Sequence, residues 1–173
     1  MKAAPNIVSN AVVYLNGRNL LGRADEVTPP AIKDVLQEHK PLGLMSAVKL
    51  ATGTIEAMEA KYKWGSVYRD VLETIADPEE SVQLMVRAEV KTFTGRGLSK
   101  TETLVMSIHG PITDTGMGSL KQGEQVKPES TQQVWYYKLE IGGNLIYEVD
   151  VFANVRKKGS RDVLESFRNL IGG

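Results

Sequence analysis

Hydrophobic and polar residues alternate from Thr131 to Val151, which predicts two strands joined by a tight turn. In the first strand Trp135, Tyr137, Leu139 and Ile141 share one face, and Gly142-Gly143-Asn144 supplies residues that tolerate the positive φ of hairpin turns. A hairpin alone is marginal in water. Other strands must therefore cover its apolar face, and we expect Trp135 and Tyr137 to lie in the core.

The same period of two predicts further strands elsewhere in the chain. Val82 to Val90 and Leu104 to Ile108 alternate on either side of the turn Gly95-Arg96-Gly97. Near the N-terminus, Ala11 to Leu15 is a short apolar run, followed by the turn Asn16-Gly17 and a returning strand from Asn19 to Val27. Thr28-Pro29-Pro30 should interrupt the ladder, because proline has no N–H to donate. Met1 to Asn10 is polar and predicted to be extended, as a free end unless a neighbouring segment pairs with it.

The segment from Val48 to Trp64 carries two patterns that compete. Ile55, Met58 and Tyr62 have helical spacing, whereas Val48, Leu50, Met58, Ala60, Tyr62 and Trp64 share the parity of a strand. We interpret the segment as strand. The preceding stretch Lys40 to Ala47 reads as a loop or hairpin tip with unusual apolar content, and an exposed apolar tip favours contact with a partner surface.

Two helices are predicted. Ser66 is a good N-cap for a helix with a stripe of Val71, Leu72 and Ile75, and Ser160 is a good N-cap for one that ends near Gly172. Strands dominate and show no βαβ alternation, which indicates a mainly β (α+β) fold. We predict an antiparallel β-sandwich or barrel with one inserted helix and a C-terminal helix, formed as a single domain over residues 1–173.

Composition narrows the classes of function. The 173 residues contain 21 Lys and Arg against 21 Asp and Glu. The chain therefore has no net positive charge that would favour binding to nucleic acid. The sequence has no cysteine, which excludes disulfides and thiol catalysis. It also lacks an apolar run long enough to span a membrane and lacks the h-region of a signal peptide, so we expect synthesis and assembly in the cytoplasm.

The sequence offers no credible active site. His39 and His109 stand apart from any carboxylate or serine motif, and surface or edge-of-core positions explain them better than metal binding or catalysis. The segment Gly116 to Gly123 superficially resembles a phosphate loop, yet it lacks the required Gly-Lys-Ser/Thr order. We therefore predict no catalytic residue, no metal, no cofactor and no enzymatic activity.

A combination of short motifs resembles the major tail tube proteins of contractile-tailed bacteriophages and R-type tailocins. The match spans nearly the whole chain, in the family's order and spacing. In the first half it rests on Asn16-Gly17, the element Thr28 to Ile32, Met45 to Val48 and Ile55 to Glu59; in the second on Asp114-Thr-Gly116, Lys121 to Glu124, Tyr136 to Leu139, Tyr147 to Asp150, Asn154-Val155 and Arg168 to Gly172. The chain departs from the family's usual Leu-Pro-Lys-Leu and Gly-Gly-Met-Asp segments at Pro29 to Ile32 and at Leu42 to Ser46.

The resemblance implies a subunit that binds copies of itself. Such subunits form hexameric rings that stack into a hollow tube inside a contractile sheath, and each lends strands to a continuous β-barrel around the lumen. Further partners would be the sheath protein, baseplate proteins and a tail terminator, with DNA passing through the lumen without specific binding and no membrane contact. The expected location is the virion tail, or a tailocin particle, assembled in the host bacterial cytoplasm.

This architecture predicts two sets of residues, one for contact between rings and one that faces the lumen. The apolar tip Leu42, Leu44 and Met45 is the expected contact between rings. If Val48, Leu50, Met58 and Tyr62 face the subunit core, the opposite parity faces the lumen, and we predict Lys33, Gln37, Lys49, Glu59, Lys61 and Lys63 there. A shift of register by one residue would exchange the two faces.

Two alternatives remain at this stage. One is a tube subunit of an apparatus related to type VI secretion, which would share the architecture. The other is a monomeric β-sandwich domain that binds a ligand, which would need a concave pocket with convergent polar groups.

Overall fold

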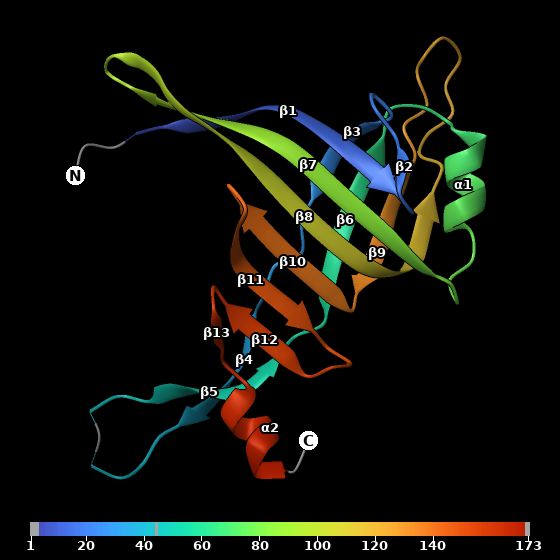
Figure 1. The fold of residues 1–173 in the computed structure, drawn as a ribbon. Helices are drawn as coiled ribbons and strands as arrows, with labels where there is room; N and C mark the ends of the chain where they lie inside the picture. Colours follow the sequence, from blue (N-terminus) through green and yellow to red (C-terminus); the bar gives the residue numbers. More distant parts are fainter. Residues whose placement is uncertain (1–3, 44, 172–173) are drawn as a thin grey trace.

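A computed structural model describes residues 4–43 and 45–171 (Figure 1). The fold is mainly β, as predicted: eleven strands form one folded antiparallel sheet, and β4 and β5 form a separate hairpin. The strands of the first layer, in spatial order, are β13 (Arg161–Asp162), β12 (Val155–Lys158), β11 (Asn144–Asp150), β10 (Tyr136–Ile141), β8 (Gly97–Gly116), β7 (Ser81–Thr94), β1 (Asn6–Leu15) and β2 (Arg18–Asn19).

The second layer continues from the far end of β8. From Ile112 onward this strand leaves β7 and β10 and pairs with β9, which pairs with β6, which pairs with β3. The strands are β9 (Glu129–Val134), β6 (Met58–Trp64) and β3 (Ala24–Thr28). The two layers therefore form a sandwich that is joined through one long strand (Figure 1).

Gly110 marks the place where β8 passes from one layer to the other. Its φ of 152° lies in a region that L side chains rarely adopt, and a Cβ there would lie 1.8 Å from the carbonyl oxygen of Gln133. Only glycine lets β8 come so close to β9 at this corner.

The core lies between the layers and has a simple sequence origin. Strand β6 alternates strictly, with Met58, Ala60, Tyr62 and Trp64 buried and the residues between them exposed. From the opposite layer Leu84, Ile108, Tyr137 and other apolar side chains pack against them. Burying a side chain of this size stabilises the fold by about 1.5–3 kcal/mol.

Several predicted elements are confirmed. The hairpin of β10 and β11 turns at Gly142-Gly143, and Tyr137 is buried; β7 and β8 turn at Thr94 to Gly97. The competing segment is strand, divided into β5 (Val48–Ile55) and β6. Strand β3 ends at Thr28, directly before Pro29.

Other predictions are wrong. The predicted strand from Asn19 to Val27 is divided, because only Arg18 and Asn19 return along β1 before the chain turns away to β3. Asn6 to Asn10 are extended, as predicted, and of the two outcomes left open for them the structure shows pairing, with β7. Trp135 lies partly exposed between β9 and β10, where its ring meets that of Phe152 edge to face.

Both helices exist but begin later than predicted. Helix α1 (Arg69–Ile75) has Tyr68 as its N-cap, and Arg23 holds this end by stacking on Tyr68 and pairing with Asp70. Ser160 lies in the turn between β12 and β13, and α2 (Glu165–Ile171) starts after Asp162 accepts a hydrogen bond from the Leu164 amide.

Candidate assembly surfaces

The outer face of the second layer is polar and nearly balanced in charge. The alternation that buries Met58 and Tyr62 exposes Glu59, Lys61 and Lys63 on the other side of β6. The neighbouring strands place acids beside these lysines: Lys63 Nζ lies 3.1 Å from Glu26 Oε2 on β3, and Glu129 on β9 stands opposite Lys63 in the ladder.

The carboxylates on this face change the pKa of Lys63. The hydrogen bond to Glu26, and then the nearby charges of Glu26 and Glu129, raise the pKa of Lys63. Glu59 is held as well, since Gln133 Nε2 donates to its Oε1 at 2.8 Å. The lysines are thus offset by carboxylates on adjacent strands.

Lys33 joins the same surface. Together with Glu56, Glu59 and Lys61 it lines a shallow hollow of about 250 Å³ where β3 gives way to the projecting hairpin. The structure therefore brings together four of the six residues that sequence parity assigned to the lumen: Lys33, Glu59, Lys61 and Lys63.

Gln37 and Lys49 do not lie on one face. In the hairpin of β4 (Asp34–His39) and β5, Gln37 pairs with Leu50 and Lys49 pairs with Glu38. Paired residues share a face and successive residues alternate, so the predicted grouping does not hold for these two. The cause is the register of the hairpin, in which each facing pair joins an odd to an even position, so residues of the same parity on β4 and β5 lie on opposite faces.

The hairpin projects from the body, with its tip far from the two layers (Figure 1). Leu42 and Met45 at the tip are fully exposed, at 105% and 104% of the reference surface, and Leu44 lies outside the described residues. The prediction that Val48 and Leu50 face the subunit core is wrong, because both are about half exposed along the hairpin.

One bidentate ion pair fixes the hairpin to the first layer. Arg156 on β12 donates to both carboxylate oxygens of Asp34, at 2.5 and 3.2 Å. The Arg156 hydrogen bond lowers the pKa of Asp34, although partial burial opposes the shift. These residues are 122 positions apart, and no local signal in the sequence connects them.

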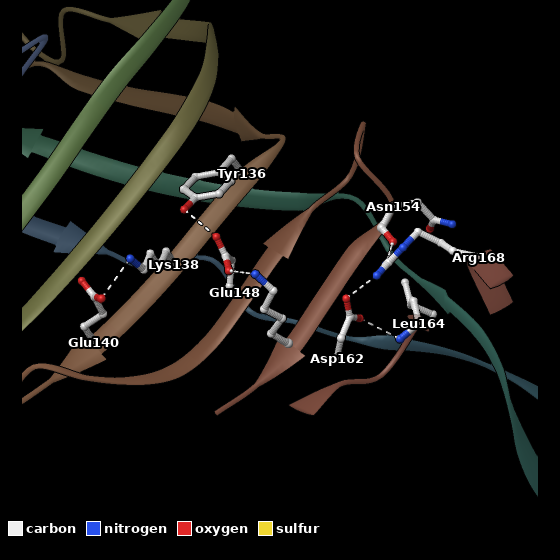
Figure 2. Close-up of polar contacts among 9 residues, drawn as sticks. Tyr136, Lys138, Glu140, Glu148, Asn154, Asp162, Leu164 and Arg168 are labelled. Carbon is white, nitrogen blue, oxygen red and sulfur yellow. Dashed lines mark hydrogen bonds and ion pairs between the residues drawn. The ribbon is translucent and has the colours of Figure 1, made fainter. Parts of the chain in front are cut away.

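A network of polar side chains links β10, β11 and β12, close to the ion pair of Arg156 and Asp34 (Figure 2). Glu148 accepts hydrogen bonds from Tyr136 Oη at 2.9 Å and from Lys157 Nζ at 3.0 Å. Burial, and then the bond to Glu148, raises the pKa of Tyr136. Arg168 binds the Asp162 carboxylate and the Asn154 carbonyl, which holds α2 against the turn that follows β11.

Several strand edges are open within the part of the chain that the structure describes, and two of them lie on β1 and β3, in different layers of the sandwich. Residues 6–12 of β1 pair with β7 on one side and with no strand on the other, and β3 pairs with β6 alone. Open edges present unpaired N–H and C=O groups that another strand can satisfy.

The described residues show no cluster of three or more His, Asp or Glu side chains suited to a metal ion. His39 lies on β4 and His109 on β8, where it stacks against Tyr136. Residues 117–128, which include most of the phosphate-loop-like segment, form the connection between β8 and β9. Among residues 4–43 and 45–171, none of the helices could cross a membrane.

A two-layer β fold with open edges, a charge-balanced outer face and an apolar projecting tip defines a structural protein suited to assembly. Comparison with known proteins identifies it further: residues 5–172 match the family described as phage tail tube protein FII. The chain belongs to this family, which is one of structural tail components and not of enzymes, as predicted.

Individual relatives agree with the family match. The chain is 24% identical over 173 residues to the tail tube protein of Escherichia phage P2, covering 98% of this chain and 99% of that one. It is 22% identical over 162 residues to the major tail tube protein of Serratia phage KSP20, covering 93% and 92%. Both relatives are tail tube proteins, in agreement with a family of virion tail components.

A solved structure shares the fold. A chain in the sheath/tube terminator structure of an extracellular contractile injection system superimposes with a TM-score of 0.56 at 13% identity, covering 79% of this chain and 96% of that chain. At this identity the likeness concerns the fold alone.

Proposed function

We propose that this protein forms hexameric rings that stack into the inner tube of a contractile tail, acting as one tail-tube domain. The tube would be the conduit for DNA ejection or the element that punctures a membrane. The observation that carries the proposal is the pair of open edges on β1 and β3, which lie in different layers of the sandwich. Strand pairing between neighbouring copies would satisfy both and would close a ring.

The outer face of the second layer is our candidate for the lumen wall. Its residues Glu59, Lys61 and Lys63 lie on β6, in the layer that such pairing would extend around a ring, and Lys33 lies beside them in the connection between β3 and β4. Because Glu26 and Glu129 accompany the lysines, a passing polyanion would meet little net positive charge. This balance suits a duct through which DNA slides without specific binding. Gln37 and Lys49 lie on opposite faces of the hairpin, so at most one of them can extend this lumen wall.

The apolar tip is our candidate for contact between rings. Leu42 and Met45 expose their whole side chains, and burial against a second ring would remove that surface from water. Contacts along the axis repeat without closing, so they propagate a tube. We further propose a sheath protein around the tube, a baseplate at one end and a terminator at the other.

Assembly of the purified protein tests this function. Concentrated protein, with or without a baseplate that initiates assembly, should yield hexameric rings or tubes by negative-stain electron microscopy. A monodisperse monomer that persists at high concentration and in the presence of the baseplate contradicts the proposal.

A further inference from the structure

We propose that the outer part of the projecting hairpin is an arm that moves on a hinge within β4 and β5, and that contact between rings fixes its direction. The arm comprises residues 36–43 and 45–51, and the hinge is formed by Val35 on β4 and residues 52–54 on β5. The hinge follows from the fold of one subunit. Only the fixing of the arm rests on the proposed function.

The hinge is a bulge in the ladder of the hairpin. The ladder pairs Asp34 with Ile55 and then resumes at Leu36. Val35 alone therefore lies opposite the three residues 52–54. Extra residues in one strand interrupt the pairing locally and let the strand bend. The arm is thus joined to its base by an irregular segment and not by a continuous ladder.

The residues of the bulge have room to change conformation. Gly53 has a φ of 85°, and nothing lies within 4 Å of its Cβ position. It borders two hollows of about 630 and 240 Å³ that are also lined by residues of β11 and β12. Across the bulge, the Thr52 hydroxyl donates to the carbonyl oxygen of Val35 at 2.9 Å in an exposed position, where water can replace it. Hinges in proteins consist of a few such residues that absorb a change in φ and ψ.

The base of the hairpin is held firmly on the other side of the bulge. Ile32 and Ile55 pack against the core, and Arg156 binds both carboxylate oxygens of Asp34. These contacts fix the direction in which the hairpin leaves the sandwich. The base is therefore the stationary side of the hinge.

The arm lacks comparable support. Every residue of its two strands is exposed, and within the described residues β4 and β5 pair with each other and with no third strand. A two-stranded hairpin alone is marginal in water. Segments with few buried apolar contacts open and move most readily in a native protein. The arm is therefore the moving side of the hinge.

The hinge determines where the apolar tip points. Leu42 and Met45 lie at the end of the arm, far from the two layers, so a rotation at the bulge changes their position relative to the sandwich (Figure 1). The tip can thus meet a second ring without straining the core. Burial of the tip against that ring would hold the arm in one direction.

Distances between two spin labels in the free subunit test the hinge, and the sequence has no cysteine to interfere. Glu38→Cys on the arm is labelled together with Thr103→Cys, an exposed position on β8. Ala31→Cys, an exposed position at the base, is labelled with the same partner as the control. Electron paramagnetic resonance then gives the distribution of distances for each pair.

We expect the distribution of the arm pair to be at least about twofold broader than that of the base pair, because a hinge adds a rigid-body motion to the arm alone. Equally narrow distributions for the two pairs in the free wild-type background overturn the hinge.

Removing the extra residues tests the place of the hinge. Without Thr52 and Gly53, Val35 would face a single residue and the ladder would continue without a bulge. The distribution of the arm pair should then narrow to the width of the base pair, which also reports that the variant is folded. Deletion of Gln122 and Gly123, exposed in the connection between β8 and β9, should leave the arm distribution broad. An arm that stays broad in a folded variant without Thr52 and Gly53 overturns the assignment of the hinge to the bulge.

The same labels in assembled tubes test the fixing of the arm. Labelled subunits are diluted with unlabelled protein, so that only distances within one copy contribute, and the arm distribution should narrow to about the width of the base pair. Tubes in which it stays as broad as in the free subunit overturn the fixing and leave the hinge and the proposed function standing. A protein that forms no tubes overturns the proposed function and the fixing together, and the hinge then stands or falls on the free subunit.

Discussion

Tyr62 and Gln132 join in the centre of the sandwich, where the phenolic hydroxyl of Tyr62 donates a hydrogen bond of 2.6 Å to Oε1 of Gln132. Gln132 is fully buried, and its amide nitrogen donates to the carbonyl oxygens of Val82 and Gly110, both at 2.8 Å. One side chain thus satisfies polar groups of β6, β7 and β8. This bridge ties the two layers together at the corner of β8.

Gln132→Leu should destabilise the subunit strongly, because it removes the acceptor of the buried Tyr62 hydroxyl and one hydrogen bond from each of two buried carbonyl groups. Each unsatisfied group costs about 1–3 kcal/mol, so the loss should be on the order of 3 kcal/mol or more. Tyr62→Phe removes one donor and should cost about 1–2 kcal/mol. Urea unfolding measures both, with Tyr14→Phe as the control; equal midpoints for wild type and Gln132→Leu would refute the bridge.

Gly110→Ala tests the corner itself. The new Cβ would lie 1.8 Å from the backbone oxygen of Gln133, so β8 and β9 must separate. We expect a loss on the order of 3–4 kcal/mol or failure to fold, as for a severe backbone clash. Gly95→Ala is the matched control, since nothing lies within 4 Å of its Cβ position. Thermal unfolding followed by circular dichroism should separate the two variants clearly, and similar midpoints would contradict the prediction.

The periodicity of the sequence predicted individual strands and the faces that they bury. Strict alternation from Met58 to Trp64 identified β6 and its buried face, and Gly142-Gly143 located the hairpin of β10 and β11. The family resemblance rested on motifs spread over the chain and was confirmed by the family match.

What the sequence could not predict depends on contacts between distant residues. The pairing of Asn6 to Asn10 with β7 gives a polar segment a strand partner, and nothing in its own composition indicates this. The opposite faces of Gln37 and Lys49 follow from the register of the β4–β5 hairpin, which pairs odd with even positions and which parity counting along the chain does not reveal. The Arg156 and Asp34 pair likewise arises only when the hairpin meets β12.

Acid should loosen the projecting hairpin. Because the pKa of Asp34 is lowered in the folded protein, its stabilising contribution is complete above its ordinary pKa of 3.8 and is lost as the pH falls through the lower folded value. Asp34→Asn should therefore raise hydrogen exchange in β4 and β5 roughly two- to fivefold at pH 7, the size expected of an exposed ion pair.

Hydrogen exchange measured by mass spectrometry, corrected for the intrinsic rate at each pH, checks this prediction. The difference between wild type and Asp34→Asn should disappear below the folded pKa, where both side chains are neutral. Asp114→Asn, an exposed change outside the hairpin, should match wild type throughout. A difference that persists at low pH would assign the effect to something other than the charge of Asp34.

Removing the acids of the proposed lumen wall should make tubes hold polyanions. Glu26→Gln with Glu59→Gln removes two of the carboxylates that accompany Lys33, Lys61 and Lys63, so that Glu56 and Glu129 alone remain beside them. We expect at least about tenfold more single-stranded oligonucleotide to sediment with these tubes at low salt, with release as salt rises. Glu79→Gln with Glu80→Gln makes the same charge change in the connection between α1 and β7 and should behave as wild type. Equal retention by the two double variants would remove this face from the lumen.

Cryo-electron microscopy of the wild-type assembly tests the central claim most directly. The account predicts rings of six copies in which neighbouring subunits pair through the open edges of β1 and β3, with Glu59, Lys61 and Lys63 facing the lumen. A tube whose lumen is lined by another face, or a protein that stays monomeric with both edges unpaired even when assembly is initiated, would contradict it.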